Sequence, residues 1–307
     1  MISQKEHLPD FLIIGAAKAG TTSLHNYLNK SRHIFMSFPK EPKYFSYSNV
    51  DVAFSGPGDN LVKKEIIKNF EAYCDLFPVK DKLKGESSAD NLYYYKYVIP
   101  AIKANLNDPV IMIILRNPIE RAFSAYTHLR RDDREKNDFE TGLELEDFRI
   151  NQGYEFIWHY KKAGLYYNQV KAYIENFSKC KIFLFEDLKN DAQKVVNGIC
   201  DILNIPYFSI NSKKIYHQSG IPKNNWKTYF YRNILVKDNI VKENIKIFLP
   251  QIIRKKIREK LSERFFNNNL LKLKMNPESK NVLIEYFRED ILKLQDLINR
   301  DLTAWLK

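Results

Sequence analysis

The chain contains 307 residues, 44% of them hydrophobic, which is enough to bury a full core and fits one α/β domain with appended helices. Its formal net charge of +12 favours polyanionic partners, such as nucleic acid, an acidic glycan, an anionic membrane surface or a multiply charged cofactor, although solvated lysine-rich faces would also explain it. Cys74, Cys180 and Cys200 are odd in number and widely spaced, so the sequence implies no disulfide framework and no zinc site.

The N-terminal residues reach a first apolar run within about ten positions, without a charged-then-apolar leader or an apolar run of membrane length. We therefore expect a soluble protein in the reduced environment of the cytoplasm.

Strand patterns alternate with helical patterns along the first two thirds of the chain. We expect strands at residues 11–14, 83–88, 110–115 and 181–185, and helices at 22–30, 63–77, 118–126, 164–177 and 192–203. Residues 130–140 read as a mobile surface insertion and residues 186–188 as a loop. This alternation predicts a parallel sheet with ligands beyond the carboxyl ends of its strands.

The C-terminal third shows basic helical and loop patterns without internal repeats. We expect a single domain over residues 1–307, with an α/β core at 8–206 and a mainly helical extension at 207–307 that packs on the core. The basic run at 254–260 fits contact with an anionic membrane surface or an acidic substrate, and it also fits a solvated helix face.

The most informative segment is FLIIGAAKAGTTS at residues 11–23, where an apolar strand runs into a glycine-bounded turn and then into a helix. Gly15 and Gly20 let the backbone approach a ligand closely. The N–H groups of Thr21, Thr22 and Ser23 open the helix, where its positive dipole end favours an oxyanion. The segment therefore predicts a phosphate or sulfate site.

This loop departs from a nucleoside triphosphate loop in two ways. Lys18 lies inside the turn rather than directly after the second glycine, and the strand at 110–115 ends in Arg116 where a magnesium-binding acid would be needed. Both departures favour a transferred group of lower charge, such as a sulfuryl group leaving an adenosine phosphate, held without a metal.

Two motifs carry a resemblance to a known family. Residues 18–24, KAGTTSL, resemble the phosphosulfate loop of sulfotransferases that use 3'-phosphoadenylyl sulfate (PAPS), and residues 115–126, LRNPIERAFSAY, resemble their 3'-phosphate motif. Residues 294–306 resemble the closing helix and Trp-Leu finish of the glycan-modifying, heparan sulfate type branch, in a bacterial-like form. The resemblance implies a P-loop-like three-layer α/β fold and a PAPS-dependent sulfotransferase that releases adenosine 3',5'-bisphosphate (PAP).

The resemblance also implies residue roles. Lys18 is expected to be catalytic, because an ammonium group can bridge the transferring sulfuryl group and the leaving phosphate. Arg116 and Ser124 are expected to hold the 3'-phosphate. The expected donor-binding residues are Lys18, Ala19, Gly20, Thr21, Thr22, Ser23, Arg116, Ser124, Tyr166, Gly220 and Lys223.

Some of these positions also fit structural roles. Tyr166 matches a family position near the donor, but an aromatic at this spacing also suits the core. Gly220 and Lys223 resemble a late loop that closes over the nucleotide, and they also suit an ordinary turn. Arg121 is expected to support its helix. The six histidines show no ligand spacing, and none is assigned a catalytic role.

Glu41 is the expected second catalytic residue, a general base in the proline-flanked loop at 37–45, whose residues 41–45 resemble the base-bearing loop of glycan sulfotransferases. It could instead pair with Lys40 or Lys43. Lys43 stands where some relatives have histidine, so its role is open. Glu86 either fixes its loop or is an exposed acid.

We therefore expect transfer of a sulfuryl group from PAPS to a hydroxyl, or an amine, of a saccharide-type acceptor, without nucleic acid as a partner. Two alternatives stay open: a divergent P-loop nucleotide kinase, and a non-catalytic basic protein that binds nucleic acid or membrane. Nothing in the sequence identifies the acceptor or the oligomeric state.

Overall fold

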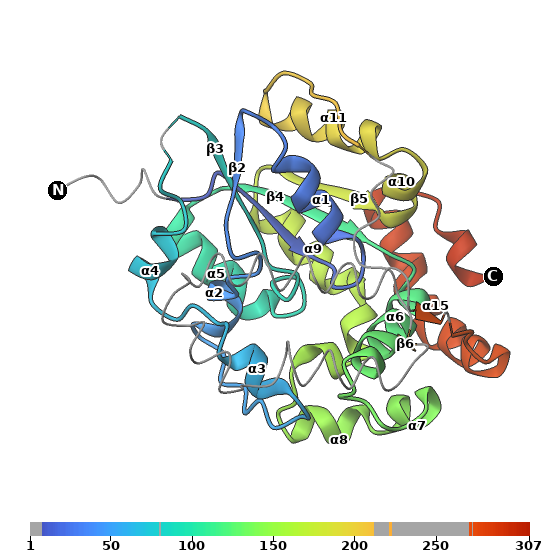
Figure 1. The fold of residues 1–307 in the computed structure, drawn as a ribbon. Helices are drawn as coiled ribbons and strands as arrows, with labels where there is room; N and C mark the ends of the chain where they lie inside the picture. The colour runs from blue at the N-terminus through green and yellow to red at the C-terminus, as the bar shows by residue number, and fades with distance from the viewer. Residues whose placement is uncertain (1–7, 80, 212–220, 223–269, 272) are drawn as a thin grey trace.

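The computed structural model of the chain describes residues 8–79, 81–211, 221–222, 270–271 and 273–307. Its centre is a five-stranded sheet in the order β2-β3-β1-β4-β5, in which every neighbouring pair is parallel (Figure 1). The strands are β1 (Phe11–Gly15), β2 (Ile34–Met36), β3 (Leu83–Ser87), β4 (Val110–Leu115) and β5 (Cys180–Leu184). The predicted P-loop-like α/β fold with a central parallel sheet is confirmed.

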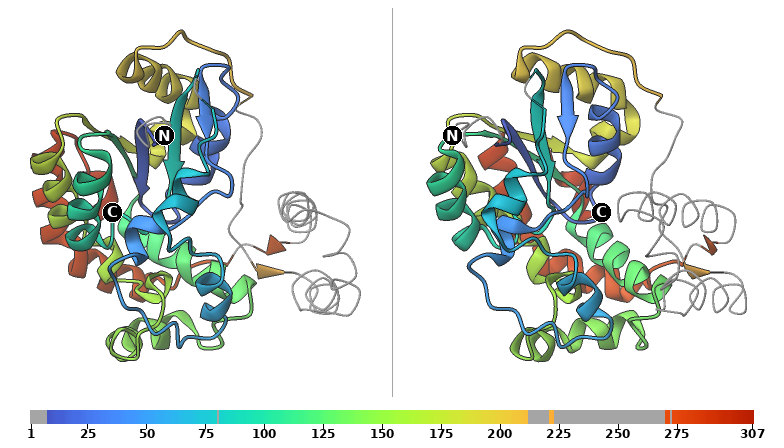
Figure 2. Two further views of the ribbon diagram at one scale, coloured as in Figure 1. Left: turned by 90° about the vertical axis from the view of Figure 1, so that its left-hand side faces the viewer. Right: turned by 60° about the vertical axis from the view of Figure 1, so that its left-hand side comes forward.

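Helices cover both faces of the sheet and make three layers (Figure 2). One face carries α1 (Thr21–Leu28) and α11 (Ala192–Leu203), and the other carries α5 (Tyr95–Leu106), α9 (Tyr166–Asn176) and α15 (Pro277–Ile298). Further α-helices are α2 (Tyr44–Tyr47), α3 (Asp59–Lys63), α4 (Phe70–Cys74), α6 (Pro118–Arg131), α7 (Phe139–Glu144), α8 (Glu146–Asn151) and α10 (Phe185–Asn190). A two-stranded antiparallel pair joins β6 (Ile221–Pro222) to β7 (Leu270–Leu271).

The neighbouring strands β1 and β4 form the centre of the core. Residues 11–14 of β1 and 111–115 of β4 are fully buried, because helices cover the sheet on both sides. A parallel strand buried on both faces is hydrophobic along its whole length, which is why these two runs were readable in the sequence. Each of these strands ends in a loop at the same edge of the sheet.

Several elements escaped the sequence analysis, among them β2 and α5. β2 has only three residues, too few for a strand pattern. α5 contains Pro100 in its interior, and proline is normally a signal that a helix has ended. By contrast, β4 and α11 begin and end at the predicted residues.

The helix predicted at 63–77 is wrong, because the chain forms α3 and α4 with a break between them. In the break, the Ile67 N–H donates to the carbonyl of Pro42 at 3.0 Å, and Asn69 caps α4 by accepting from the Ala72 N–H at 3.1 Å. A contact distant in sequence thus interrupts a locally helical pattern.

The loop predicted at 186–188 lies within α10. The carboxylate of Asp187 accepts a hydrogen bond from the Leu184 N–H at 3.1 Å and caps the start of that helix.

The mobile insertion predicted at 130–140 is also wrong. α6 continues to Arg131, and the buried carboxylate of Glu135 pairs with Arg149 at 2.8 Å. The side chain of Arg134 is only 12% exposed and pairs with Asp59. Arg134 and Glu135 thus meet buried partners rather than water, whereas Lys136 and Asp133 form an exposed pair.

The described part of the C-terminal extension is α15, which packs on α9 and α6, and a short 3-10 helix at Thr303–Leu306. The closing helix expected at 294–306 is interrupted, because Asn299 ends α15 in the left-handed conformation with φ of 49°. Gly220, Lys223 and the basic run at 254–260 lie outside the described residues. Among the described residues, no helix is both long and apolar enough to cross a membrane.

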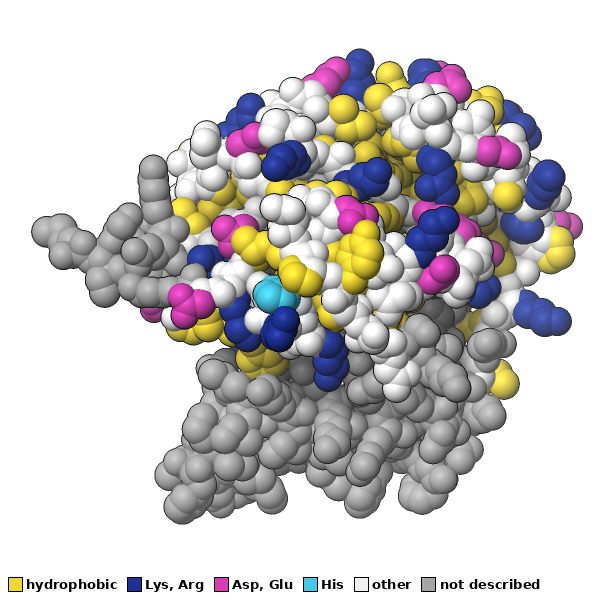
Figure 3. All heavy atoms as spheres, turned by 90° about the horizontal axis from the view of Figure 1, so that it is seen from above, with side chains coloured by type: hydrophobic (Ala, Val, Ile, Leu, Met, Phe, Trp, Pro, Cys, Tyr) yellow, Lys and Arg dark blue, Asp and Glu magenta, His cyan; other side chains and the backbone are white. Residues whose placement is uncertain are grey.

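Basic and acidic side chains alternate on the face seen from above in Figure 1, without a continuous region of one sign among its described residues (Figure 3). Exposed regions of one sign attract polyanions through long-range fields, whereas interspersed charges largely cancel. The excess of lysine and arginine therefore does not form a basic surface there.

Candidate active site

The loop after β1 presents a helix N-terminus with free donors. Gly20 precedes α1 with φ of 96°, no side chain caps the helix, and no acidic residue lies in its first turn. The first N–H groups of a helix have no partner within it, so those of Thr21, Thr22 and Ser23 are available to an anion.

Gly20 also lies against the start of α10. A Cβ atom added to Gly20 would lie 3.0 Å from a side-chain carbon of Leu188 and 3.1 Å from one of Phe185. The positive φ and this close approach both require glycine here.

Lys18 lies in the same loop. Its φ of 68° falls in the left-handed region of backbone conformation, which residues other than glycine rarely adopt. Burial and the positive charges of Arg131 and Arg116 lower the pKa of Lys18 to about 7, although Asp132 and Glu41 act in the opposite direction. A bound anion would stabilise the charged form of a lysine that lies among other positive charges.

Arg116 follows β4, which is the neighbour of β1 in the sheet. Its guanidinium donates to the carbonyl of Lys18 at 3.2 Å and to the carboxylate of Glu120 at 3.4 Å. Its planar group also lies 4.9 Å from the ring centre of Phe185. The two predicted anion loops are therefore in direct contact at one edge of the sheet.

Ser124 and Arg121 lie further along α6. Ser124 is 3% exposed, on the buried side of the helix. Arg121 is fully buried and donates to the carbonyls of His159 and Tyr160, so it supports the packing of α6 as expected. Two of its nitrogen atoms have no partner among the described residues.

Tyr166 is fully buried, and its hydroxyl has no partner within the described part of the chain. Burial raises the pKa of Tyr166 above 10, while Arg121 and Arg116 oppose the shift. Its backbone N–H donates to Asp290 of α15 at 2.7 Å. The residue is thus a core aromatic that lies within electrostatic reach of Arg116.

Glu41 and Lys43 belong to a loop fastened to the carboxyl end of β3, the other neighbour of β1. The Glu41 N–H donates to the Ser87 carbonyl at 3.0 Å, and the Lys43 N–H donates to Ser88 Oγ at 3.1 Å. Both residues have positive φ, 59° and 58°. Backbone strain of this kind gathers at functional sites.

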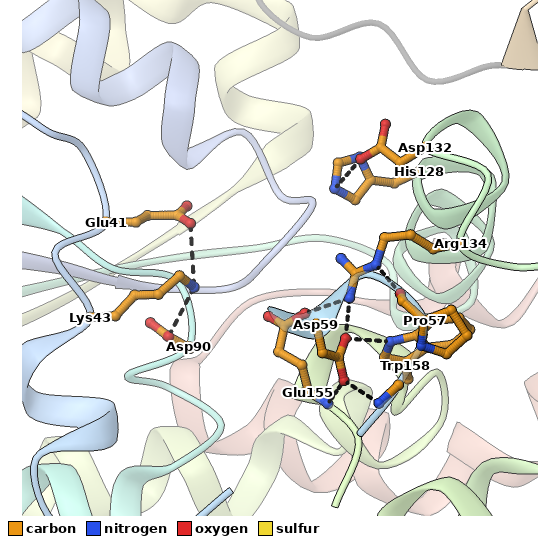
Figure 4. Close-up of polar contacts among 11 residues, drawn as sticks. Glu41, Lys43, Pro57, Asp59, Asp90, His128, Asp132, Arg134, Glu155 and Trp158 are labelled. Carbon is orange, nitrogen blue, oxygen red and sulfur yellow. Dashed lines mark hydrogen bonds and ion pairs between the residues drawn. The ribbon is translucent and has the colours of Figure 1, made fainter. Parts of the chain in front are cut away.

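The side chains of this loop form an ion-pair chain (Figure 4). The Glu41 carboxylate pairs with Lys40 and lies 3.6 Å from Lys43 Nζ, which itself lies 3.1 Å from the buried carboxylate of Asp90. Burial alone would raise the pKa of Glu41, but Lys40 and Lys43 hold it well below its usual range. Glu41 is therefore ionised at neutral pH.

Lys43 is buried and remains charged. Burial alone would lower the pKa of Lys43, yet Asp90 and Glu41 hold it above its usual range. Glu86, at the end of β3, accepts a hydrogen bond from the Tyr73 hydroxyl at 2.9 Å, and burial raises its pKa to about 7. Glu86 is thus a loop-fixing acid and not an exposed one.

His128 and Asp132 lie beside this site, and the sequence analysis missed them. His128 Nδ1 is 2.7 Å from the Arg131 guanidinium, and Nε2 is 3.7 Å from the Asp132 carboxylate. Arginine is only a donor, so Nδ1 accepts and Nε2 carries the proton toward Asp132. Burial and the charge of Lys18 hold the pKa of His128 well below its usual value.

A sequence signal for this pair existed. Ser124, His128 and Asp132 follow one another at intervals of four, so Ser124 and His128 lie along one side of α6, and Asp132 caps the end of that helix. The side of α6 that presents the predicted phosphate ligand Ser124 also presents His128.

A second buried cluster, centred on Asp59, lies across from Glu41 in the close-up (Figure 4). The Asp59 carboxylate is fully buried and accepts from Arg134, from the Trp158 indole N–H at 3.0 Å and from the Glu155 N–H at 2.8 Å. Buried charges with several such partners are held rigidly.

A hollow of about 540 Å³ lies at the opposite end of the sheet, lined in part by Asp108 and Ser178, which precede β4 and β5. A small cavity of about 10 Å³ lies beneath the loop after β1, lined in part by Ala16, Arg121 and Gln169. Neither hollow is lined by Lys18, Arg116 or Glu41.

The chain matches known proteins along most of its length. A model of the sulfotransferase domain family matches residues 8–291. A crystal structure of a sulfotransferase from Alicyclobacillus acidocaldarius is similar over 98% of this chain and 99% of its own, with 31% identity and a TM-score of 0.75.

Curated relatives are more distant. The membrane-associated sulfotransferase kil1 of Dictyostelium discoideum is 23% identical over 96% of this chain and 66% of its own length. A bifunctional heparan sulfate N-deacetylase/N-sulfotransferase 1 of Caenorhabditis elegans is 29% identical over 70% of this chain and 24% of its own. The chain thus spans from about a quarter to two thirds of these relatives.

The family match confirms the class of enzyme that the two loops predict. Its extent, from before β1 to within α15, includes the loop after β1, the Glu41 loop and Arg116. The chain belongs to the sulfotransferase domain family.

Proposed function

We propose that this protein transfers a sulfuryl group from PAPS to a hydroxyl, or an amine, of a saccharide-type acceptor. The observation that carries the proposal is the contact between Arg116 and the carbonyl of Lys18. It joins two anion-binding segments at the carboxyl ends of adjacent parallel strands, where open α/β sheets bind their ligands.

The residues present suit a donor with phosphate at both ends of an adenosine. The uncapped N-terminus of α1, with Lys18 and Gly20 before it, supplies donors for a phosphosulfate group. Arg116 and Ser124 would hold the 3'-phosphate, and Tyr166 would lie behind it. Ala19 completes the loop, while Gly220 and Lys223 stay predictions from the sequence.

In the proposed reaction, the Glu41 carboxylate accepts the proton of the acceptor hydroxyl or amine as that group bonds to sulfur. The bond between sulfur and the phosphate oxygen of the donor breaks, and PAP leaves. Lys18 stabilises the charge that grows on that oxygen. Glu41 is ionised but a weak base while it pairs with Lys40, so acceptor binding has to loosen that pair.

The proposal of a saccharide acceptor is based on similarity to named relatives. The relatives named heparan sulfate N-deacetylase/N-sulfotransferase support a glycan acceptor, and the loops that would form its site, at 46–62 and 128–160, contain the Asp59 and His128 clusters. A nucleotide kinase is disfavoured by Arg116, which stands where an acid would hold magnesium.

Titration with PAP tests the donor. We expect micromolar binding by the unchanged protein and loss of most of it in Lys18→Ala and Arg116→Ala, each shown to be folded. Transfer of labelled sulfate from PAPS to a panel of glycans then tests the reaction. Binding of duplex DNA or anionic vesicles that survives both substitutions, in a protein that does not bind PAP, would favour the non-catalytic alternative.

A further inference from the structure

The start of α10 lies behind both anion loops. The ring of Phe185 is 4.9 Å from the Arg116 guanidinium, and one of its carbons is 3.1 Å from the position that a Cβ atom on Gly20 would occupy. A shift of α10 would therefore move the Phe185 ring, which contacts both Arg116 and the turn before α1.

The C-terminal segment, residues 299–307, holds α10 in place and lies beside it (Figure 1). Arg300 donates to both carboxylate oxygens of Asp187, at 2.9 and 3.1 Å. The indole N–H of Trp305 donates to Glu186 Oε1 at 3.2 Å. Asp187 and Glu186 directly follow Phe185 in the chain, so both contacts fix the first turn of α10.

Trp305 also reaches the end of β4. Its carbonyl accepts a hydrogen bond from the Asn117 side-chain amide at 3.4 Å, and the oxygen of that amide caps α6 by accepting from the Ile119 N–H at 2.9 Å. Asn117 follows Arg116 directly. One residue near the C-terminus thus connects the chain after β4 with the chain after β5, on either side of Arg116.

Burial makes these contacts consequential. Trp305 is 4% exposed and Leu302 is 1% exposed, so the segment is part of the core. Glu186 Oε2 is buried without a partner among the described residues, so the indole bond to Oε1 helps to stabilise a carboxylate whose other oxygen is unsatisfied there.

We propose that Trp305 is a positioning residue for the nucleotide donor, which sets the place of Arg116 and of the loop before α1 through Glu186 and Asn117. The proposal rests on the proposed function, because it assumes that the donor binds between these loops. It differs from a role in folding alone in one respect: donor affinity depends on Trp305 more than acceptor affinity or stability does.

The test compares two buried tryptophans that each donate an indole N–H to a carboxylate, which is partly buried at Glu186 and fully buried at Asp59. Trp305→Phe removes the bond to Glu186, and Trp158→Phe removes the bond to Asp59, on the far side of the site. We expect Trp305→Phe to weaken PAP binding and raise the KM for PAPS roughly tenfold, since small displacements of binding groups have effects of this size or larger. We expect Trp158→Phe to leave PAP affinity unchanged, and Trp305→Phe to leave the acceptor KM unchanged.

A double-variant cycle locates the effect. If the indole acts through Glu186, PAP affinity in the combined Trp305→Phe and Glu186→Ala protein equals that of Glu186→Ala alone. Arg300→Gln, at a half-exposed ion pair that the fold tolerates losing, provides a second variant in case Trp305→Phe does not fold, and we expect roughly threefold weaker PAP binding.

Unchanged PAP affinity in the folded Trp305→Phe and Arg300→Gln proteins would overturn the positioning role and leave the proposed function intact. Equal losses in Trp305→Phe and Trp158→Phe would also overturn it, by showing that general destabilisation is the cause. Failure of the unchanged protein to bind PAP would overturn the proposed donor, and the positioning role with it.

Discussion

The guanidinium of Arg116 donates a hydrogen bond to the main-chain carbonyl of Lys18 at 3.2 Å. The cation that follows β4 is thus bonded to the turn that follows the neighbouring strand β1. Burial, and then the positive charges of Arg131 and Arg116, lower the pKa of Lys18, and a bound anion would offset both effects by stabilising the ammonium group.

The first prediction concerns pH. Because the pKa of Lys18 is about 7 in the free protein and a bound phosphosulfate or phosphate would raise it, PAP binding should take up a proton. Affinity is then complete below pH 7 and falls as pH rises above 7, by roughly tenfold per unit until the raised pKa of the complex is reached. Calorimetry in buffers of different ionisation enthalpy measures the proton uptake.

Lys18→Arg is the matched control, because an arginine stays charged throughout this range. Its PAP affinity should be flat between pH 7 and 9. A similar fall with pH in both proteins would assign the titration to another group.

The second prediction separates a base from an ion pair at Glu41. Glu41→Gln keeps the shape and the oxygen but cannot take a proton, so kcat should fall by about a hundredfold or more, while PAP affinity changes little. Single-turnover transfer of labelled sulfate measures the effect. A variant with normal kcat and reduced stability would show that Glu41 serves only to pair with Lys40 and Lys43.

The third prediction concerns the shape of the group at position 116. Arginine donates in two directions at once, to Lys18 and Glu120, and it stacks on Phe185, which a lysine cannot do. Arg116→Lys should therefore weaken PAP binding by at least about tenfold although the charge is kept. Arg130→Lys, on the same helix but bonded to the carbonyl of Lys136 at 2.8 Å, should leave PAP affinity unchanged.

The fourth prediction concerns stability. Asp90→Asn would leave the buried ammonium group of Lys43 with only the Glu41 carboxylate, 3.6 Å away, and removing one partner of a buried pair costs about 3–5 kcal/mol in the free energy of unfolding. Urea denaturation measures this cost. Asp147→Asn breaks an exposed pair with Lys162 and should cost less than about 1 kcal/mol.

Adding Lys43→Met to Asp90→Asn should recover part of the lost stability, because no unpaired charge then stays buried. If the double variant is less stable than Asp90→Asn alone, the unpaired charge of Lys43 is not the cause of the stability lost in Asp90→Asn.

The fold was predictable where the local sequence of a segment is enough to specify its secondary structure. β1 and β4 are apolar runs that end in Gly15 and Arg116, and each specifies a buried strand followed by a polar loop whatever surrounds it. The alternation of such strands with helices then determines a parallel sheet, and a parallel sheet places its loops at one edge. The anion loops at Lys18 and Arg116 were predicted by this reasoning.

The other parts of the site depend on which segments become neighbours. Glu41 meets Lys43 and Asp90 because its loop lies on the end of β3, which the strand order places next to β1. His128 approaches Lys18 only because α6 packs across the site, and Trp305 meets Glu186 across 119 residues of chain.

Local sequence by itself determined β1, β4 and the polar loops that follow them, because the apolar pattern and the glycines act within a few residues. The tertiary structure alone decided the ionisation of Lys18, the ion pairs of Glu41 and the contacts of Trp305. Those properties arise from burial and from charges brought together by packing, and neither is encoded in the spacing of residues along the chain.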